Sequence, residues 1–202
     1  MAKPPSNQAS RKSRIVQAAI KCFIKHGVAQ TRMSEVALKA GVDQPLIHYY
    51  FPTPDTLYAS VIQEIVEELK EEVVEALSKG AADPAQALTH YIRAHFAWAE
   101  RNPGLFALWI YFYYLAGFNP TFTAINKLIR EAGRDRIASL IYRGIEQGDF
   151  SLPKTTTVST AALNIQGLIT GNVIMAATEA PADWEPFTES TVQLSLSLCR
   201  SK

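Results

Sequence analysis

Hydrogen-bonding side chains are crowded into one short segment of the chain, residues 44–51, whose sequence is QPLIHYYF. His48, Tyr49 and Tyr50 occupy consecutive positions, and a helix cannot bury three consecutive side chains on one face. An imidazole, two phenol hydroxyls and the amide of Gln44 can donate to phosphate oxygens, and the amide can also pair with a base edge. The segment therefore predicts a contact surface for a polyanion, unless the tyrosines simply pack against the following helix.

The residues around this segment predict two short helices joined by a tight turn. The first helix is expected over residues 33–40 and ends at Gly41, a residue that suits the left-handed position after a helix. Asp43 is a favourable N-cap, so the second helix is expected over residues 44–51. This arrangement is typical of a helix-turn-helix, which presents its second helix to the major groove of DNA.

The second of these helices is expected to have a buried side and an exposed side. Ile47 and Phe51 are four residues apart, so both face the protein interior in this interpretation. The polar side chains of the segment then face solvent. Pro45 and Leu46, close to the start of the helix, can reach the methyl group of a thymine.

Helical periodicity extends over nearly the whole chain. Apolar residues recur three and four positions apart, and no stretch alternates for long enough to indicate a strand. The chain is therefore expected to be all-α, with about nine helices. The expected helices cover residues 11–26, 33–40, 44–51, 54–79, 84–101, 103–116, 120–147, 155–177 and 183–199.

Charge is distributed unevenly along the chain. The 202 residues carry a formal net charge of +1, but residues 1–51 contain eight Lys and Arg residues against only Glu35 and Asp43. Residues 52–202 contain twelve Lys and Arg residues against seventeen acidic residues. A basic N-terminal part followed by an acidic remainder is expected when only one part of a protein binds a polyanion.

The cysteines and the apolar runs indicate in which cellular compartment the protein is expected. Cys22 and Cys199 lie near opposite ends of the chain, and the polar start MAKPPSNQAS has no apolar leader segment. The most apolar run, residues 105–118, is shorter than the ~20 residues that a helix needs to span a bilayer. We therefore expect a cytoplasmic protein without a membrane-spanning helix.

Residues 13–60 resemble the tetracycline-repressor (TetR) family of bacterial transcription regulators. The resemblance lies in SRIVQAAIKCFIKHGVAQTRMSEVALKAGVDQPLIHYYFPTPDTLYAS, with its paired alanines, its Ala-Gly-Val turn and its aromatic-rich helix. It implies a homodimer that binds double-stranded DNA at a palindromic operator and a C-terminal domain that binds a small-molecule inducer. We accordingly expect a flexible tail over residues 1–10, a helix-turn-helix domain over 11–52 and a helical domain for ligand binding and dimerisation over 53–202.

The resemblance also implies individual DNA contacts. The residues implied are Thr31, His48 and Tyr49 or Tyr50 for phosphates, and Ser34, Gln44, Pro45 and Leu46 for base edges. Two positions depart from the family pattern. Arg32 replaces a common threonine, so a helix cap is lost and a cation near the DNA is gained. Pro54 replaces a common lysine, so a contact there must use backbone N–H groups.

Basic residues at the start of the first expected helix are expected to add contacts. Arg11, Lys12 and Arg14 can bind phosphates or enter the minor groove. The alternative for these side chains is a solvated basic tail.

Aromatic side chains are concentrated in the C-terminal part. Residues 91–122 hold eleven of the twenty aromatic residues, and the four at 111–114 cannot share one face of a helix. Some of them are therefore expected to line a pocket for an uncharged or weakly charged amphipathic or aromatic effector, with ordinary core packing as the alternative for each member. The residues expected to bind this effector are Tyr91, His95, Trp98, Phe106, Trp109, Phe112, Tyr113 and Asn164.

The last two expected helices suggest a subunit interface. The helix over 155–177 is apolar on more than one face, as a helix buried by its own subunit and by a partner should be. We expect a four-helix bundle between two subunits related by a twofold axis. The residues expected in the interface are Ala161, Leu163, Gly167, Leu168, Gly171, Leu194 and Leu198.

The sequence contains no catalytic or metal-binding motif that we recognise. It lacks His-Glu-x-x-His, Gly-x-Ser-x-Gly and a phosphate-binding loop. His90 and His95 are five apart, off the spacing of four that suits a shared metal ion, and are expected to be ordinary hydrogen-bonded side chains. We therefore expect a cofactor-free, ligand-responsive repressor that is not an enzyme. A DNA-binding regulator whose body docks a partner protein is the alternative, and an all-α enzyme or carrier is a remote one.

Overall fold

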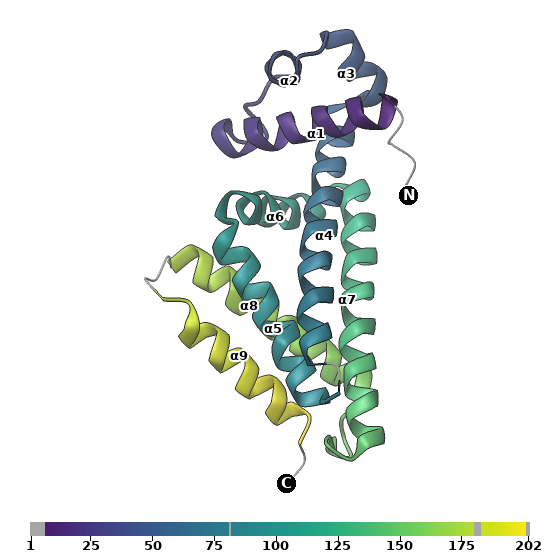
Figure 1. The fold of residues 1–202 in the computed structure, drawn as a ribbon, viewed down its shortest axis with the longest axis vertical. Coiled ribbons are helices and arrows are strands. Elements are labelled where there is room, and N and C mark those ends of the chain that lie inside the picture. Colours follow the sequence, from purple (N-terminus) through teal and green to yellow (C-terminus); the bar gives the residue numbers. More distant parts are fainter. Residues whose placement is uncertain (1–6, 81, 180–182, 201–202) are drawn as a thin grey trace. The chain divides into compact units, whose positions relative to one another are not determined.

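The computed structural model describes residues 7–80, 82–179 and 183–200, and these residues form nine α-helices (Figure 1). The expected all-α class is confirmed, because the only β pairing in the described part of the chain is an isolated bridge between Ser151 and Arg200. The helices are α1 (Asn7–His26), α2 (Met33–Ala40), α3 (Gln44–Tyr50), α4 (Pro54–Lys79), α5 (Pro84–Arg101), α6 (Pro103–Ala116), α7 (Pro120–Gln147), α8 (Val158–Glu179) and α9 (Glu185–Leu198).

Most expected helix limits agree with these bounds, and the differences have local causes. α1 begins at Asn7, so residues 7–10 are helical rather than part of a tail, while residues 1–6 of the expected tail lie outside the described residues. α8 begins three residues later than expected because the hydroxyl of Thr157 accepts a hydrogen bond from the N–H of Thr160 at 3.1 Å. α9 begins after Asp183, whose carboxylate accepts from the N–H of Glu185 at 2.9 Å.

The chain divides into two compact units. The first comprises Met1–Glu67 with Gly104–Phe112, and the second comprises Glu68–Pro103 with Tyr113–Lys202. α4 and α6 therefore contribute residues to both units. The domain limits expected at residues 10 and 52 stay predictions.

The first unit is built around the apolar face of α1. Ile15 and Ala19 have no exposed surface, and Phe23 packs edge-on against Tyr58 of α4 with ring centroids 5.8 Å apart. Tyr58 in turn donates a hydrogen bond of 2.5 Å to the carbonyl of Leu108. The start of α4 and the middle of α6 thus belong to the same core as α1.

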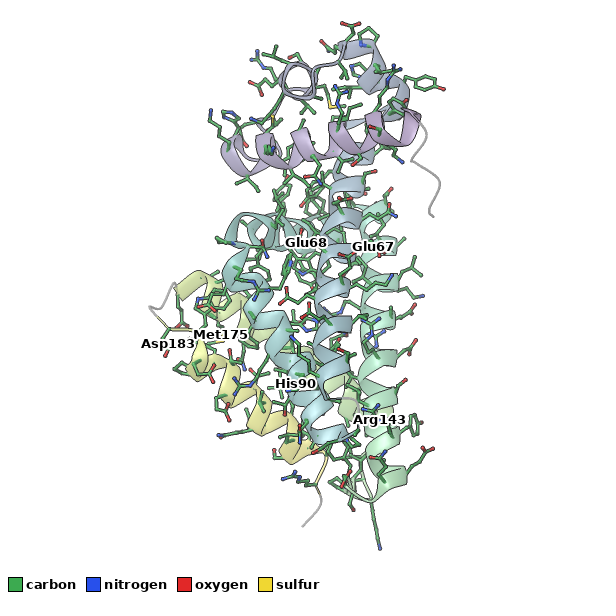
Figure 2. All side chains as sticks on the ribbon, in the orientation of Figure 1. Glu67, Glu68, His90, Arg143, Met175 and Asp183 are labelled. Carbon is green, nitrogen blue, oxygen red and sulfur yellow. The ribbon has the colours of Figure 1, made fainter. Side chains whose placement is uncertain are left out.

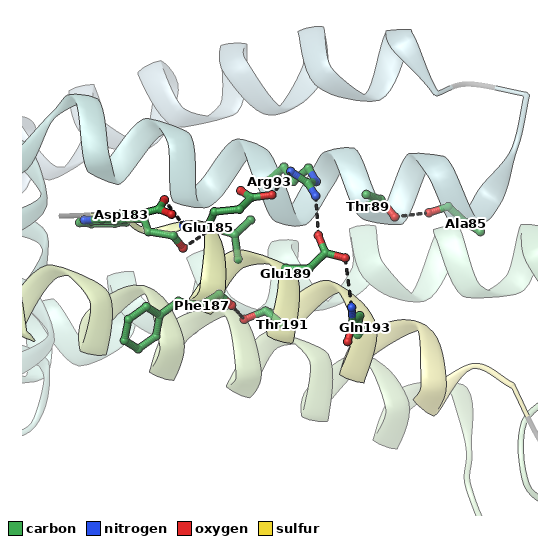
Figure 3. Close-up of polar contacts among 11 residues, drawn as sticks. Ala85, Thr89, Arg93, Asp183, Glu185, Phe187, Glu189, Thr191 and Gln193 are labelled. Carbon is green, nitrogen blue, oxygen red and sulfur yellow. Dashed lines mark hydrogen bonds and ion pairs between the residues drawn. The ribbon is translucent and has the colours of Figure 1, made fainter. Parts of the chain in front are cut away.

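The second unit is a helical bundle in which α5 packs against α7, α8 and α9. Arg93 of α5 forms ion pairs with Glu185 at 3.0 Å and with Glu189 at 2.5 Å (Figure 3). Thr191 is fully buried and accepts a hydrogen bond of 2.8 Å from the side chain of Asn172. These polar contacts fix α9 against α5 and α8.

Candidate nucleic-acid interface

The turn between α2 and α3 is held by the end of α2. Gly41 adopts φ +63°, a left-handed conformation that glycine tolerates without cost. Its N–H donates to the carbonyl of Leu38 at 3.2 Å, and the N–H of Val42 donates to that of Ala37 at 3.1 Å. This pair of bonds ends α2 sharply and brings α3 back after a turn of three residues.

The start of α2 is capped in an unusual way. Arg32 occupies the N-cap, and the carboxylate of Glu35 accepts a hydrogen bond of 3.0 Å from its N–H. The expected loss of a side-chain cap is confirmed, since Arg32 offers no acceptor. Both Arg32 and Ser34 are exposed.

α3 separates a buried side from an exposed one, as expected. Ile47 has no exposed surface, and Phe51, the C-cap residue just after α3, retains 1%. The exposed side chains are those of Gln44, Pro45, His48 and Tyr49, and those of Leu46 and Tyr50 are half-buried. The surface therefore carries an amide, an imidazole and phenol groups above an apolar base.

The tyrosines do not behave alike. Tyr49 is 71% exposed, so the interpretation that it packs against the next helix is wrong. The ring of Tyr50 lies 5.2 Å from that of Tyr49 and 6.5 Å from that of Phe51. Tyr50 thus links the exposed surface to the core.

Asp43 differs from expectation. It occupies the N-cap position of α3, but its side chain makes no capping hydrogen bond. By contrast, the start of α4 is capped reciprocally, because Thr53 and Thr56 each accept the other's N–H through their hydroxyls at 3.2 Å. The N-terminus of α3 is therefore the less firmly held of the two.

Two residues expected to contact DNA already have partners within the protein. The hydroxyl of Thr31 donates to the carbonyl of Gly27 at 2.7 Å, so it cannot donate to a phosphate unless that bond breaks. The guanidinium of Arg14 donates through Nη2 to the carbonyls of Ala40 at 2.7 Å and Gly41 at 3.3 Å.

Several of the expected effector residues lie on one side of α5 in the second unit. The ring of Tyr91 lies 4.6 Å from that of His95, whose Nδ1 donates to the Tyr91 carbonyl at 2.8 Å. Burial lowers the pKa of His95 and raises that of Tyr91 to about 12. Trp98 is buried and donates through Nε1 to the carboxylate of Glu68 at 3.1 Å.

The remaining aromatic residues of the expected effector set are divided between the units. Phe106, Trp109 and Phe112 belong to the first unit, where the rings of Trp109 and Phe112 lie 5.4 Å apart. Tyr113 belongs to the second unit, and the guanidinium of Arg130 lies 6.0 Å from its ring centroid. Either unit by itself therefore contains only part of the set.

The two histidines of α5 differ in their partners. His95 is hydrogen-bonded, as expected, but Nδ1 of His90 is buried without a hydrogen-bond partner (Figure 2). The same holds for Nε and Nη2 of Arg143 on α7. Among the described residues, no group of His, Cys, Asp or Glu side chains is arranged to hold a metal ion.

An open groove of about 660 Å³ runs along α8 and α9 in the second unit. It is lined by Arg130, Leu163, Asn164, Gly167, Leu168, Gly171, Asn172, Leu194, Ser197 and Leu198. Six of the seven residues expected in a subunit interface are among them. The seventh, Ala161, is fully buried within its own chain and does not line the groove.

Asn164 does not join the aromatic residues, because it is exposed in this groove. Arg130, Asn172 and Ser197 also line this groove and were not identified from the sequence. The spacing of Asn164, Leu168 and Asn172, each four residues after the last, could have identified Asn172 as part of the same face.

Comparisons with known proteins agree with this architecture. Residues 15–61 match the sequence model of the family described as bacterial regulatory proteins, tetR family. The HTH-type transcriptional regulator BetI of Rhizobium meliloti (strain 1021) is 32% identical over 103 residues, which are 51% of this chain and 50% of that protein. The chain thus spans about half the length of that curated relative.

Solved structures share the fold. A TetR transcription regulator from Haloarcula marismortui ATCC 43049 superposes with a TM-score of 0.80 at 20% identity, over 94% of this chain and 96% of that one. The transcriptional regulator FadR from Bacillus subtilis, in complex with stearoyl-CoA, gives a TM-score of 0.77 at 21% identity, over 92% and 98%. The solved structures show a shared fold, and the sequence matches over residues 15–61 and to BetI support membership of the tetR family of bacterial regulatory proteins.

Proposed function

We propose that this protein regulates transcription by inserting α3 into the major groove of DNA. The observation that carries the proposal is the division of α3 into a fully buried apolar side and an exposed side with hydrogen-bonding groups. Gln44 near the start of α3 suits bidentate recognition of adenine, and His48 and Tyr49 suit phosphate oxygens. A cytoplasmic site of action follows from this role.

Selection of bound DNA from a random pool tests the proposal. The expected result is a short palindrome, whose retardation by the protein weakens as salt concentration rises. A pool without enrichment at low ionic strength, and no retardation of any genomic fragment, would remove the proposed function.

A palindrome requires two copies of α3, and we propose that the groove of α8 and α9 is the surface that pairs two subunits. Leu163 and Leu194 are 50% and 48% exposed there. Gly167 and Gly171 are also exposed, and a Cβ added at either would meet nothing within 4 Å. Glycine in a helix interior costs about 1 kcal/mol relative to alanine, and packing within the chain gives no reason for it here.

The composition of α8 fits a protein partner better than lipid. α8 is the one helix in the described part of the chain that is long and apolar enough to cross a membrane. One of its faces is buried in its own unit, and the groove beside the other is lined by Asn164, Asn172 and Arg130. Polar side chains on a lipid-facing surface are costly, whereas a second subunit can satisfy them. Sedimentation at micromolar concentration should therefore give a dimer, and a monomer would contradict the interface.

We further propose that a small amphipathic or aromatic effector binds the body and releases the protein from its operator, so that the protein acts as a repressor. Support comes from the aromatic side of α5 and from the FadR structure, in which a relative of the same fold is bound to stearoyl-CoA. Such an effector acts only if it binds better to the state that does not bind DNA.

Isothermal titration with a panel of compounds tests the effector, with Trp98→Ala as the variant that should weaken binding. If no compound binds but the body captures a specific protein, the regulator is controlled by a partner protein instead.

A further inference from the structure

We propose that Arg14 positions the recognition helix α3 by holding the turn in front of it, rather than by contacting DNA. This inference rests on the proposed DNA-binding function and deepens it. Arg14 of α1 reaches across 26 residues of sequence, and its Nη2 donates to the carbonyls of Ala40 at 2.7 Å and Gly41 at 3.3 Å. These are the last residue of α2 and the residue that caps it.

Two different sets of donors bond to the carbonyls at the end of α2. The N–H groups of Gly41 and Val42 serve the carbonyls of Leu38 and Ala37. Those groups cannot also reach the carbonyls of Ala40 and Gly41, which point beyond the helix end and accept from Arg14 instead. The positive guanidinium is additionally favoured at the negative end of the α2 dipole.

α3 has little else to fix its start. It is only seven residues long, and a helix of this length is not stable without tertiary contacts. The side chain of its N-cap residue, Asp43, makes no capping bond. Its position therefore depends on its buried residues and on the turn that Arg14 holds.

α1 is a suitable platform for this contact. Ile15, the neighbour of Arg14, has no exposed surface, so the backbone that carries Arg14 is anchored in the core. Lys12 is also on α1, and its Nζ lies 5.8 Å from the centroid of the Phe51 ring at the other end of α3. The first half of α1 thus contacts the chain on both sides of the recognition helix.

Amide hydrogen exchange in the DNA-free protein tests this role directly. In Arg14→Ala, the amides of Gly41, Val42 and Leu46 should exchange at least tenfold faster, while those in the middle of α1 stay protected. Lys21→Ala removes an exposed cation from the same helix and should leave exchange as in the wild type. Arg14→Lys retains a donor and should restore part of the protection. Unchanged exchange in Arg14→Ala would overturn the proposal.

The salt dependence of DNA binding separates positioning from phosphate contact. With a DNA fragment selected by the wild-type protein, Arg14→Ala should lower the affinity about tenfold without changing the slope of log K against log salt concentration. Loss of a direct phosphate contact would instead reduce the magnitude of that slope by about 0.9, which would also overturn the proposal. If the wild-type protein binds no DNA, the proposed function fails, and the exchange measurement still decides the role of Arg14.

Discussion

The hydroxyl of Tyr58 on α4 donates a 2.5 Å hydrogen bond to the carbonyl of Leu108 on α6, fifty residues further along the chain. Tyr58 retains 1% exposed surface, and its burial raises the pKa of the hydroxyl above its ordinary value. The bond lies inside the unit that contains the helix-turn-helix, so part of α6 belongs to the core that supports α3.

Tyr58→Phe should therefore destabilise the first unit without unfolding it. Removing this hydroxyl should cost about 1 kcal/mol, since a buried hydrogen bond is lost while the ring remains. Tyr58→Ala should cost about 3–5 kcal/mol, because a large cavity is left. Urea unfolding measures both values, and Tyr49→Phe, which alters an exposed ring, should change the free energy of unfolding by less than about 0.5 kcal/mol. Equal effects of Tyr58→Phe and Tyr49→Phe would contradict the importance of the bond.

The limits of the helices could be predicted from sequence because their signals are local. Pro84, Pro103 and Pro120 each follow Asp or Asn and begin a helix at the expected residue. The assignment of side chains to units could not be predicted in the same way. Trp109 and Tyr113 are four residues apart on α6 yet belong to different units, because membership of a unit depends on tertiary contacts and not on local sequence.

For the candidate DNA-binding surface, the sequence likewise predicted the buried side chains but not the tertiary contacts. The inward positions of Ile47 and Phe51 follow from helical spacing, and the structure confirms them. The partners of Thr31 and Arg14 are backbone carbonyls, which sequence patterns do not reveal. A carbonyl acceptor has no residue type, so a side chain that looks free in the sequence can be committed in the fold.

Gln44→Ala should weaken binding to the selected palindrome more than binding to unrelated DNA. If the Gln44 amide reads an adenine, its loss should cost about 1–3 kcal/mol on the selected palindrome. Binding to unrelated duplex, which depends on phosphates, should change little. Competition between the selected palindrome and unrelated DNA measures the difference. Gln63→Ala, at an exposed position of α4, is the matched control, and an equal loss on both DNAs would contradict base recognition by Gln44.

His95 should make the second unit less stable as the pH falls. Burial lowers its pKa below the ordinary value of 6.5, so the folded protein favours the neutral ring while the unfolded chain takes up a proton more readily. The contribution is therefore present above about pH 6.5 and is lost as pH falls through the lower folded-state pKa.

His95→Asn should reduce this acid dependence, because the amide can still donate toward the Tyr91 carbonyl but does not titrate. Urea unfolding at pH 7.5 and pH 5.5, followed by tryptophan fluorescence, compares the variant with the wild type. His26→Asn replaces an exposed histidine and should retain the wild-type dependence. If the free energy of unfolding of His95→Asn falls between pH 7.5 and pH 5.5 as much as that of the wild type, the prediction is wrong.

Gly171→Ala should stabilise the single subunit but weaken dimerisation. Within one chain a Cβ at this position meets nothing within 4 Å, so the substitution should stabilise α8 by up to about 1 kcal/mol through helix propensity. If the partner helix approaches closely at Gly167 and Gly171, the same methyl group should weaken dimerisation, and Gly171→Leu should weaken it further.

Sedimentation equilibrium measures dimerisation, and thermal unfolding of the dissociated subunit measures its own stability. Ala132→Leu enlarges an exposed residue of α7 in the same unit and should leave dimerisation unchanged. Because the two effects of Gly171→Ala have opposite signs, a general disturbance of the fold cannot produce them together. A Gly171→Leu variant that dimerises like the wild type would show that the partner subunit does not pack over this part of α8.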